Sequence, residues 1–393
     1  MTFNSEMIIA RADVNPKPVN STVLSDEILS KLSIKHISGE QWDKEIACFD
    51  GVVQEQLYVF SKNRWPSVNC EAVLFYAGDE IIGGALVLVQ GLPLKLGSIA
   101  VVKWGPILKS HNKEMKDINY SKCVAALLEE YDKKRRMMIS ILPRAEYGEN
   151  NSEYEHLRSI GFSKGSQLRF PNRYFINLEL DGEAQLNSLN QKWRYHLRKS
   201  EKAGLVFEHV FAEQMPEFSS LYTKMNERKK FVDHSAYDDT IDVLMNIKDK
   251  ELCPELFFVR KGEEIIAGAI IFKSGECAVY LYGATSQSAL KLRAGYFLHW
   301  HIIKWLSDNT KAKYYDLGGT DGYQGLHQFK KGMVGSKGII APVPAVMNYS
   351  SYFLPFLMGR AAFFARDMLI QLKHVISSFR GDISKPDQAR SNR

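Results

Sequence analysis

The sequence predicts a mixed α/β (α+β) protein in which two domains of the same topology follow one another. The first reason is length, because 393 residues exceed what a single hydrophobic core usually serves. The second is an internal repeat of one pattern, "LFYAGDEIIGGALVL" at 74–88 and "FFVRKGEEIIAGAIIF" at 257–272. Glu80 and Glu264 hold the same place in the two copies and lie 184 residues apart, which is a domain-sized spacing. The third is that the same order of elements follows each copy.

Each element follows from its own pattern. An apolar strand, a turn with glycine and acidic residues, and a second apolar strand make each copy a hairpin. After each hairpin, a segment with apolar residues three and four apart lies between two short β-rich segments, which predicts strand, helix and strand. These segments are "SIAVVKWGPIL", "SKCVAALLEEYDKKRR" and "MMISILP" in the first copy, and "CAVYLYGAT", "GYFLHWHIIKWLSDN" and "AKYYDLG" in the second. We expect the helices to pack on mixed sheets.

The chain is therefore expected to contain four segments: a flexible leader over 1–32, a first domain over 33–172, a second over 173–348, and a basic amphipathic helix with a tail over 349–393. The apolar fraction of 45% and the charged fraction of 24% are those of an ordinary globular protein. The five cysteines form no C-x-x-C pair, and no histidines cluster at metal-ligand spacing. We expect no metal site, and a reduced, cytoplasmic environment. The N-terminus lacks the pattern of a signal peptide.

The C-terminal region leaves two alternatives open. Residues 339–359 are uncharged and long enough to span a bilayer, but their three prolines and Asn348 argue against a transmembrane helix, because lipid offers few partners to freed backbone groups. The next stretch, "FLMGRAAFFARDMLIQLKHVISSFR", mixes apolar and basic residues at roughly helical spacing. Such a helix either docks on its own domain or lies on the inner face of an anionic membrane.

Basic residues concentrate in one stretch, "NQKWRYHLRKSEKAG". The net charge of +6 permits a polyanionic partner without requiring one. On a helix Arg194 and Arg198 share a face, where they form a fork suited to a phosphate or carboxylate of a substrate. The alternative is a solvated helical face.

A second stretch, "YYDLGGTDGYQGLHQFKKGM" at 314–333, combines glycines, an acid and lysines. An apolar strand ends at Asp316, a loop runs through Gly318 and Gly319, and the chain returns with Phe329 and Lys330. Glycine has no Cβ and tolerates positive φ, so such a loop can approach a ligand closely. The alternative is a tight turn after a core strand, with its lysines on the surface.

The doubled unit of hairpin, strand, helix and strand resembles two tandem copies of the Gcn5-related N-acetyltransferase (GNAT) fold, with mixed sheets flanked by helices. Its combination with "KWRYHLRKSEKAGLVFE" at the start of the second copy and "YYDLGGTDGYQGLHQFKKGM" near its end resembles the Fem family (FemAB/FemX) of nonribosomal aminoacyltransferases. The similarity covers roughly residues 33–348. The resemblance implies a transferase that extends the peptide of a peptidoglycan precursor, with aminoacyl-tRNA as the donor.

Two positions depart from the family pattern. Trp104 precedes Gly-Pro where the family commonly has a basic residue, and Lys109 stands where it has an acid. Looser Fem-like proteins are associated with extracellular polysaccharide synthesis. The resemblance thus implies transfer of an acyl or aminoacyl group to the amino group of a cell-envelope precursor, a nucleotide- or lipid-linked sugar or peptide of the peptidoglycan or a polysaccharide pathway. The alternative is a noncatalytic Fem-like module that binds RNA or an anionic membrane through its basic face.

The resemblance also implies roles for single residues. In this fold donor and acceptor meet in a notch where two central strands splay apart, and a buried Lys330 ammonium there stabilises the tetrahedral oxyanion of transfer to an amine. Because adjacent residues on a strand face opposite sides, only one of Lys330 and Lys331 can point into the notch, and the resemblance favours Lys330. Asp316 either takes a proton from the attacking ammonium or bonds loop N–H groups as a strand-end acid.

Further residues are expected to line the substrate site: Phe329, Gly318 and Gly319. Tyr280 and Tyr282 alternate onto one face of their strand, either as a substrate-lining pair or as ordinary core aromatics.

The donor site follows from a weakened motif. Simple acetyltransferases of this fold bind the pyrophosphate of coenzyme A with backbone N–H groups of an Arg/Gln-x-x-Gly-x-Gly/Ala loop at a helix start. The matching stretch, "KLRAGYFLHW", offers only Arg293 and Gly295. We therefore rank aminoacyl-tRNA or another carrier-bound donor above acyl-CoA. No tightly bound cofactor is expected, and the expected partners are the cell-envelope acceptor and tRNA.

Overall fold

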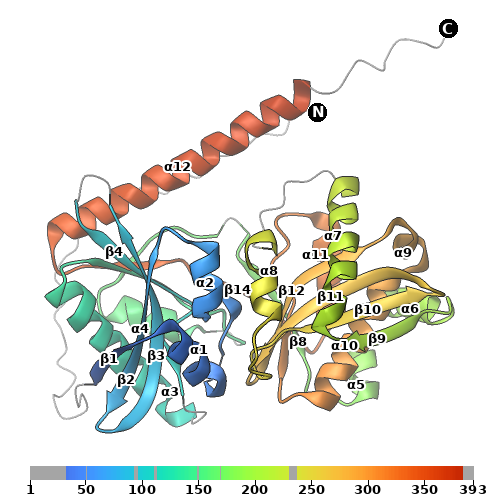
Figure 1. The fold of residues 1–393 in the computed structure, drawn as a ribbon, viewed down its shortest axis with the longest axis horizontal. Helices are drawn as coiled ribbons and strands as arrows, with labels where there is room; N and C mark the ends of the chain where they lie inside the picture. The colour runs from blue at the N-terminus through green and yellow to red at the C-terminus, as the bar shows by residue number, and fades with distance from the viewer. Residues whose placement is uncertain are drawn as a thin grey trace. The chain divides into compact units, whose positions relative to one another are not determined.

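A computed structural model describes residues 32–383, apart from residues 50, 93–95, 110–112, 148–149, 169 and 230–236. The predicted leader, except Leu32, and the tail beyond residue 383 lie outside the described residues. The described part contains two mixed β-sheets flanked by helices, as Figure 1 shows, which confirms the predicted fold class. It belongs to one compact unit.

The first sheet takes most of its strands from the N-terminal half of the chain. These are β1 Ser33–Ile37, β2 Asn69–Ala77, β3 Glu80–Gly91, β4 Ser98–Lys103, β5 Ile107–Leu108, β6 Met138–Leu142, β7 Ser163–Lys164 and β15 Met347–Tyr349. Their order is β1-β2-β3-β4-β6-β15-β7, with β5 beside β3. Only the pair of β4 and β6 is parallel among those described. The helical segments here are α1 Gly39–Glu45, η1 Ile46–Cys48, η2 Gln54–Gln56, α2 Tyr58–Arg64, α3 Lys113–Leu127, η4 Leu128–Lys134 and α4 Ser152–Ser159.

The second sheet repeats this plan. Its strands are β8 Asn172–Asn177, β9 Val206–Val210, β10 Glu255–Lys261, β11 Glu264–Ser274, β12 Cys277–Thr285, β13 Tyr314–Asp316 and β14 Ile339–Pro342. Their order is β14-β8-β13-β12-β11-β10-β9, and β12 runs parallel to β13. Its helical segments are α5 Gly182–Ser188, α6 Gln191–Glu201, η5 Ala212–Gln214, α7 Met215–Lys229, α8 Tyr237–Met245, α9 Gln287–Leu292, α10 Ala294–Asn309 and α11 Gln324–Val334.

The two hairpins occupy corresponding places in separate sheets. In each sheet the hairpin is followed by an antiparallel strand, β4 or β12, then by a helix, α3 or α10, and then by a parallel strand. Even the register irregularity recurs, between Phe75 and Tyr76 in β2 and between Val259 and Arg260 in β10. The repeat in the sequence therefore reflects a repeat of topology.

Each sheet also contains one strand that follows the other copy in the chain. β8 comes directly after the first copy but joins the second sheet between β13 and β14. β15 comes after the second copy but joins the first sheet between β6 and β7. The predicted end of the second domain at residue 348 therefore cuts through a strand of the first sheet.

The two copies share part of their hydrophobic core. One buried cluster contains Trp42 and Leu74 from the first copy together with Leu244, Phe272 and Val279 from the second. The second sheet is covered on one face by α6, α10 and α11 and on the other by α7 and α8, and each face has its own apolar cluster. Burial of this kind makes the second sheet a rigid support for the loops at its edge.

The helix predicted after residue 349 is α12, Phe353–Ile383. Its first half lies beside β4 and β6, as Figure 1 shows for β4. Gly359 lies close against β6, since a Cβ built on it would come within 2.5 Å of the Met138 Cε atom. Within the described residues, no helix combines the length and the apolarity needed to cross a membrane.

Candidate active site

The predicted notch lies between β12 and β13. The two strands pair only from Cys277 to Val279 on β12 and from Tyr314 to Asp316 on β13. Beyond these pairs β12 continues to Thr285 against β11, whereas β13 ends and the chain enters the glycine loop. The strands therefore part immediately after Val279 and Asp316, and we call this place the notch.

Lys330 reaches the notch from α11. Its Nζ atom donates hydrogen bonds of 2.5 Å to the carbonyl oxygens of Leu317 and Gly319 and lies 5.8 Å from the centre of the Tyr280 ring. The residue is 5% exposed, whereas Lys331 is on the surface. The expectation that these lysines lie on a strand was wrong, because they are in a helix. Adjacent side chains on a helix also point in different directions, about 100° apart. The prediction that only one of the two lysines points into the notch therefore holds, but because of helix geometry and not strand geometry.

The surroundings of Lys330 lower its proton affinity. Burial is the main cause that brings the pKa of Lys330 down to about 8, and the charge of Arg173 adds to the effect while that of Asp316 opposes it. Burial and the charge of Lys330 in turn lower the pKa of His299 to about 3, so this imidazole is neutral at pH 7. Burial raises the pKa of Tyr280 to about 12. Near neutral pH, Lys330 is thus a cation among neutral rings.

Asp316 is held in an ion pair. Arg173 Nε donates to both carboxylate oxygens, at 3.1 and 2.9 Å, and a second guanidinium nitrogen donates at 2.5 Å. One oxygen also accepts the N–H of Gly318 at 2.8 Å. This is the strand-end role that the sequence offers as one of two alternatives. A proton-accepting role for Asp316 stays a prediction.

The glycine loop contributes its carbonyl groups to the site. Gly318 has φ +70°, a conformation that glycine adopts readily, and this turns the chain so that two carbonyls of the loop meet Lys330. Among the described residues, apart from its neighbours in the chain, the nearest atom to a Cβ built on Gly319 is the Asn172 carbonyl oxygen, at 3.8 Å. The loop therefore fixes the lysine, and contact of either glycine with substrate stays a prediction.

Tyr280 and Tyr282 do not share a face, contrary to the prediction. The register of β12 against β11 shifts between Ile270 and Ile271, so Ile271 is opposite Tyr280 and Ile270 is opposite Tyr282. This bulge at Leu281 sends Tyr280 toward α10, where its hydroxyl lies over Gly283, and Tyr282 into the cluster under α7 and α8. Only Tyr280 borders the notch.

Phe329 packs α11 against α6 and α10. Its ring lies 5.0 Å from Tyr296, 5.6 Å from His299 and 6.1 Å from Trp193, measured between ring centres. These contacts join α6, α10 and α11. Phe329 therefore positions Lys330, and its predicted contact with substrate is untested.

Arg194 and Arg198 play unequal parts. Arg194 Nη1 donates to the carbonyls of Asn187 at 2.7 Å and Leu189 at 2.9 Å, at the C-terminal end of α5. Arg198 is exposed on α6. In the predicted fork, Arg194 thus stabilises the turn between α5 and α6 through these hydrogen bonds. Anion binding by Arg194 and Arg198 together stays a prediction.

The predicted donor residues lie at the start of α10. Arg293 separates α9 from α10 with φ +59°, and its side chain is exposed. Gly295 lies in the first turn of α10, and a Cβ built on it would lie 3.9 Å from the Phe329 Cζ atom. The N-terminus of this 16-residue helix carries partial positive charge. The assignment to a donor site stays a prediction.

A cavity of about 500 Å³ adjoins the ion pair of Asp316. Its lining includes Trp104, Arg144 and Tyr147 from the first copy and Arg173 and Asp316 from the second. The indole N–H of Trp104 is buried and has no hydrogen-bond partner in the described part of the chain. Arg173 thus lines this cavity and also holds Asp316, the residue at which β13 ends at the notch. The sequence shows no pattern around Arg173 that would have identified it.

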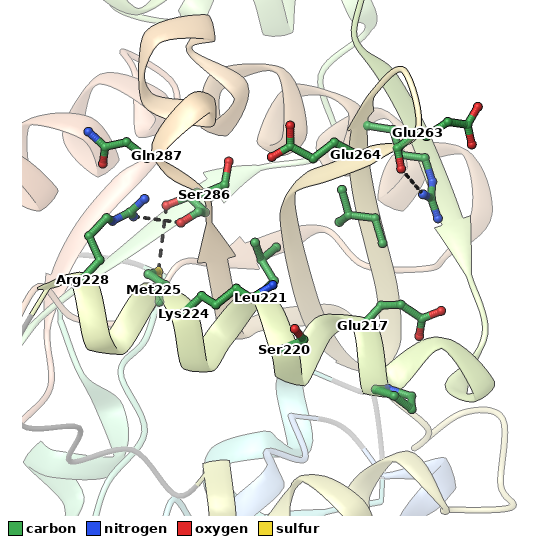
Figure 2. A pocket seen from close by; sticks show the side chains of 14 residues that line it. Glu217, Ser220, Leu221, Lys224, Met225, Arg228, Glu263, Glu264, Ser286 and Gln287 are labelled. Carbon is green, nitrogen blue, oxygen red and sulfur yellow. Dashed lines mark hydrogen bonds between the residues drawn. The ribbon is translucent and has the colours of Figure 1, made fainter.

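Figure 2 shows a second, larger cavity of about 780 Å³ beside α7, on the face of the second sheet that α7 and α8 cover. It lies between α7, the β10–β11 turn and the loop that follows β12. Its lining balances three acids against three bases: Glu217, Glu263, Glu264, Lys224, Arg228 and Arg260. Arg228 donates to the carbonyl of Thr285 at 2.8 Å. This balance gives the cavity no preference for an anion.

Comparisons with known proteins agree with this architecture. The model of the acetyltransferase (GNAT) domain matches residues 187–331, and that of the FemAB family matches residues 61–243. The crystal structure of FemX has a TM-score of 0.65 at 17% identity, over 81% of this chain and 97% of that one. None of the curated protein sequences matches this chain significantly.

Another similar structure is the C-terminal domain (DUF2156) of a putative lysylphosphatidylglycerol synthetase from Agrobacterium fabrum, with a TM-score of 0.51 at 13% identity over 83% of this chain and 97% of that one. A conserved protein of unknown function from Bacteroides thetaiotaomicron reaches 0.51 at 12% identity, over 81% and 98% of the two chains. At such identities the likeness concerns the fold. The chain thus resembles Fem-like proteins: parts of it match the models of the FemAB family and of the GNAT domain, and its described part has the tandem acetyltransferase-type fold of FemX.

Proposed function

We propose that the protein is an N-acyltransferase that moves an acyl or aminoacyl group to the amino group of a cell-envelope precursor. The observation that carries the proposal is the buried ammonium of Lys330 at the notch of the second domain. An ammonium has three N–H donors, and two of them are bound to carbonyls. Within the described residues no hydrogen bond of the third N–H is seen, and we propose that it binds the oxyanion.

The chemistry needs little else from the protein. The neutral amine of the acceptor attacks the acyl carbon, and negative charge develops on the carbonyl oxygen. When the tetrahedral intermediate collapses, the bond from the acyl carbon to the carrier breaks, and the proton of the amine nitrogen passes, directly or through water, to the oxygen or sulfur of the carrier, which leaves as an alcohol or thiol. Lys330 stabilises the oxyanion because it is already desolvated and held by Leu317 and Gly319.

The class of substrate rests on the comparisons. The chain matches the model of the FemAB family and has the fold of FemX and of a domain from a putative lysylphosphatidylglycerol synthetase. These names concern acyl or aminoacyl transfer and the cell envelope, and they support an acceptor of that kind. We propose that the acceptor occupies the 500 Å³ cavity beside Arg173, because Asp316 both lines this cavity and ends β13 at the notch.

The donor is proposed to be a co-substrate, with no tightly bound cofactor. Arg293 and Gly295 at the start of α10 are its proposed binding residues, and aminoacyl-tRNA is ranked above acyl-CoA. Incubating purified protein with cell-envelope nucleotide sugars and lipid-linked precursors, together with labelled aminoacyl-tRNA or labelled acyl-CoA, tests the reaction and names the donor. We expect label in the acceptor with one donor. No transfer from either donor to any acceptor would support a noncatalytic module.

A further inference from the structure

The helix α12 has an apolar face that the described part of the chain leaves exposed. Six large apolar side chains on it are between 49% and 78% exposed: Phe353, Leu354, Leu357, Phe364, Met368 and Leu369. Single exposed apolar residues are ordinary on protein surfaces, but a contiguous group marks an interaction surface. The group spans 17 residues of one helix.

These side chains lie on one side of the helix, opposite the side that packs on the protein. At about 100° per residue, they fall within about 160° of the circumference. Gly359, which lies against Met138, falls about 160° from the middle of this arc. The helix thus docks on the first domain with one face and presents an apolar face on the other side. We call this exposed group the α12 stripe.

Basic residues flank the α12 stripe. Arg360 lies just beyond one edge of the arc and is exposed, and its guanidinium packs on Phe356. Arg366 lies about 60° beyond the other edge, toward the docked face, where it bonds Asp367 and Ser166. In the sequence of the rest of α12 the same apolar spacing continues, at Leu372, Val375, Ile376 and Phe379. The pattern of aromatic and aliphatic residues on one side with arginine at its borders is typical of helices that lie in a membrane surface.

The width of the stripe decides between two occupants. Two copies of a helix that pair as a coiled coil use a narrow seam of positions three and four apart. An arc of about 160° would leave much of its apolar surface outside such a seam. A lipid surface covers a wide arc, because the helix sinks into the boundary of headgroups and acyl chains along its whole length. The net charge of +6 adds attraction to anionic lipid.

We propose that the α12 stripe binds the surface of an anionic membrane and holds the protein there with α12 parallel to the surface. The proposal is independent of the acyltransferase reaction. It needs only the exposed apolar face, its arginine borders and the docking of the opposite face at Gly359.

The experiment measures co-flotation of the full chain with vesicles. One set contains phosphatidylcholine alone, and the other contains about one-third phosphatidylglycerol. We expect binding to the anionic vesicles, weaker binding when the salt concentration rises from 0.1 to 0.5 M, and at least tenfold weaker binding by a triple variant of the stripe, L357S/F364S/M368S. Absence of binding to both vesicle sets would overturn the proposal.

A matched control distinguishes binding through the α12 stripe from nonspecific binding through any exposed apolar side chain. Val206, Phe211 and Leu290 are 53%, 72% and 49% exposed and lie outside α12, against 49%, 68% and 55% for the three stripe residues. The variant V206S/F211S/L290S is expected to bind anionic vesicles as the wild type does. Equal losses in the two triple variants would overturn the assignment to α12. So would a wild-type dimer in solution that the stripe variant converts to a monomer, since the occupant would then be a second copy.

Discussion

Lys330 is the residue on which the proposed chemistry depends. Replacing it with alanine should lower kcat by about a hundredfold or more, the scale seen when one donor to an oxyanion is removed. Lys331→Ala is the control on the same helix, and it should have almost no effect because that side chain is exposed. Steady-state kinetics of the two variants checks the prediction. Small and equal effects would mean that the loop before α11 is only a turn.

The burial of Lys330 also predicts how stability depends on pH. Its pKa is about 8 in the folded protein, against an ordinary value of 10.5, so the unfolded chain binds more protons between these limits. The cost of burying the ammonium is therefore fully present below pH 8 and is relieved as the pH rises toward 10.5. Between pH 7 and 9.5 the wild type should gain about 2 kcal/mol in unfolding free energy relative to Lys330→Met.

Urea unfolding at the two pH values measures this difference, and Lys331→Met is the reference for other titrating groups. A difference that stays constant with pH, or falls, would contradict the assigned direction of the pKa shift.

The ion pair of Asp316 leads to a third prediction. Asp316→Asn leaves the guanidinium of Arg173, whose side chain is 22% exposed, without its counter-charge. We expect the unfolding free energy to fall by about 3 kcal/mol, and the double variant D316N/R173M to recover more than half of that loss. If the double variant is stable but inactive, the carboxylate or the guanidinium also acts in the reaction. If it is no more stable than D316N, the pair is not what holds the strand end.

Some of these residues could be read from the sequence and others could not. The resemblance selected Lys330, and the structure places it, buried, at the notch. The shared face of Tyr280 and Tyr282 followed from strict alternation, which one bulge at Leu281 reverses. Arg173 was missed because its partner, Asp316, lies 143 residues away in the chain.

At the scale of elements, Arg194 ties α5 to α6. Arg194→Ala removes two hydrogen bonds to carbonyls at the end of α5 and should lower the unfolding free energy by about 1 kcal/mol, whereas Arg198→Ala should be neutral. Thermal denaturation of both variants measures this. If the two arginines also form an anion fork, both variants raise the KM for the acceptor. A raised KM in R194A alone would point to the α5–α6 turn instead.

The hairpins, the crossover helices and the parallel strands were all predictable because each has a clear period of its own. The helix α11 was not, because "LHQFKKGM" is short and borders glycines, which suits a returning strand equally well. Packing of Phe329 against Trp193 and Tyr296 stabilises the helix instead. Tertiary contacts of this kind have no local signal in the sequence.

At the scale of the whole molecule, the exchange of β8 and β15 joins the two copies. No local pattern predicts which sheet a three-residue strand such as Met347–Tyr349 joins, since its partners lie about 200 residues earlier. The segment after it also serves the first copy. The carboxylate of Asp132 is fully buried, and it accepts hydrogen bonds from Ser350 and Ser351.

This exchange predicts that the first domain depends on the end of the chain. A truncation after residue 346 removes β15 and exposes the site of Met347, which is fully buried, and it leaves Asp132 without the hydrogen bonds of the two serines. Loss of a buried methionine costs about 2–5 kcal/mol and each lost hydrogen bond about 1 kcal/mol, which together approach the whole stability of a domain.

A truncation after residue 352 is the matched control, because it removes α12 but keeps β15 and both serines. We expect the amides of β4 and β6 to be protected from hydrogen exchange in the longer form and to lose that protection in the shorter form. The shorter form should also lose protection in β8 and β13, because the two copies share a core. Mass spectrometry of both forms gives the answer. Equal protection in the two forms would show that the first sheet is complete without β15.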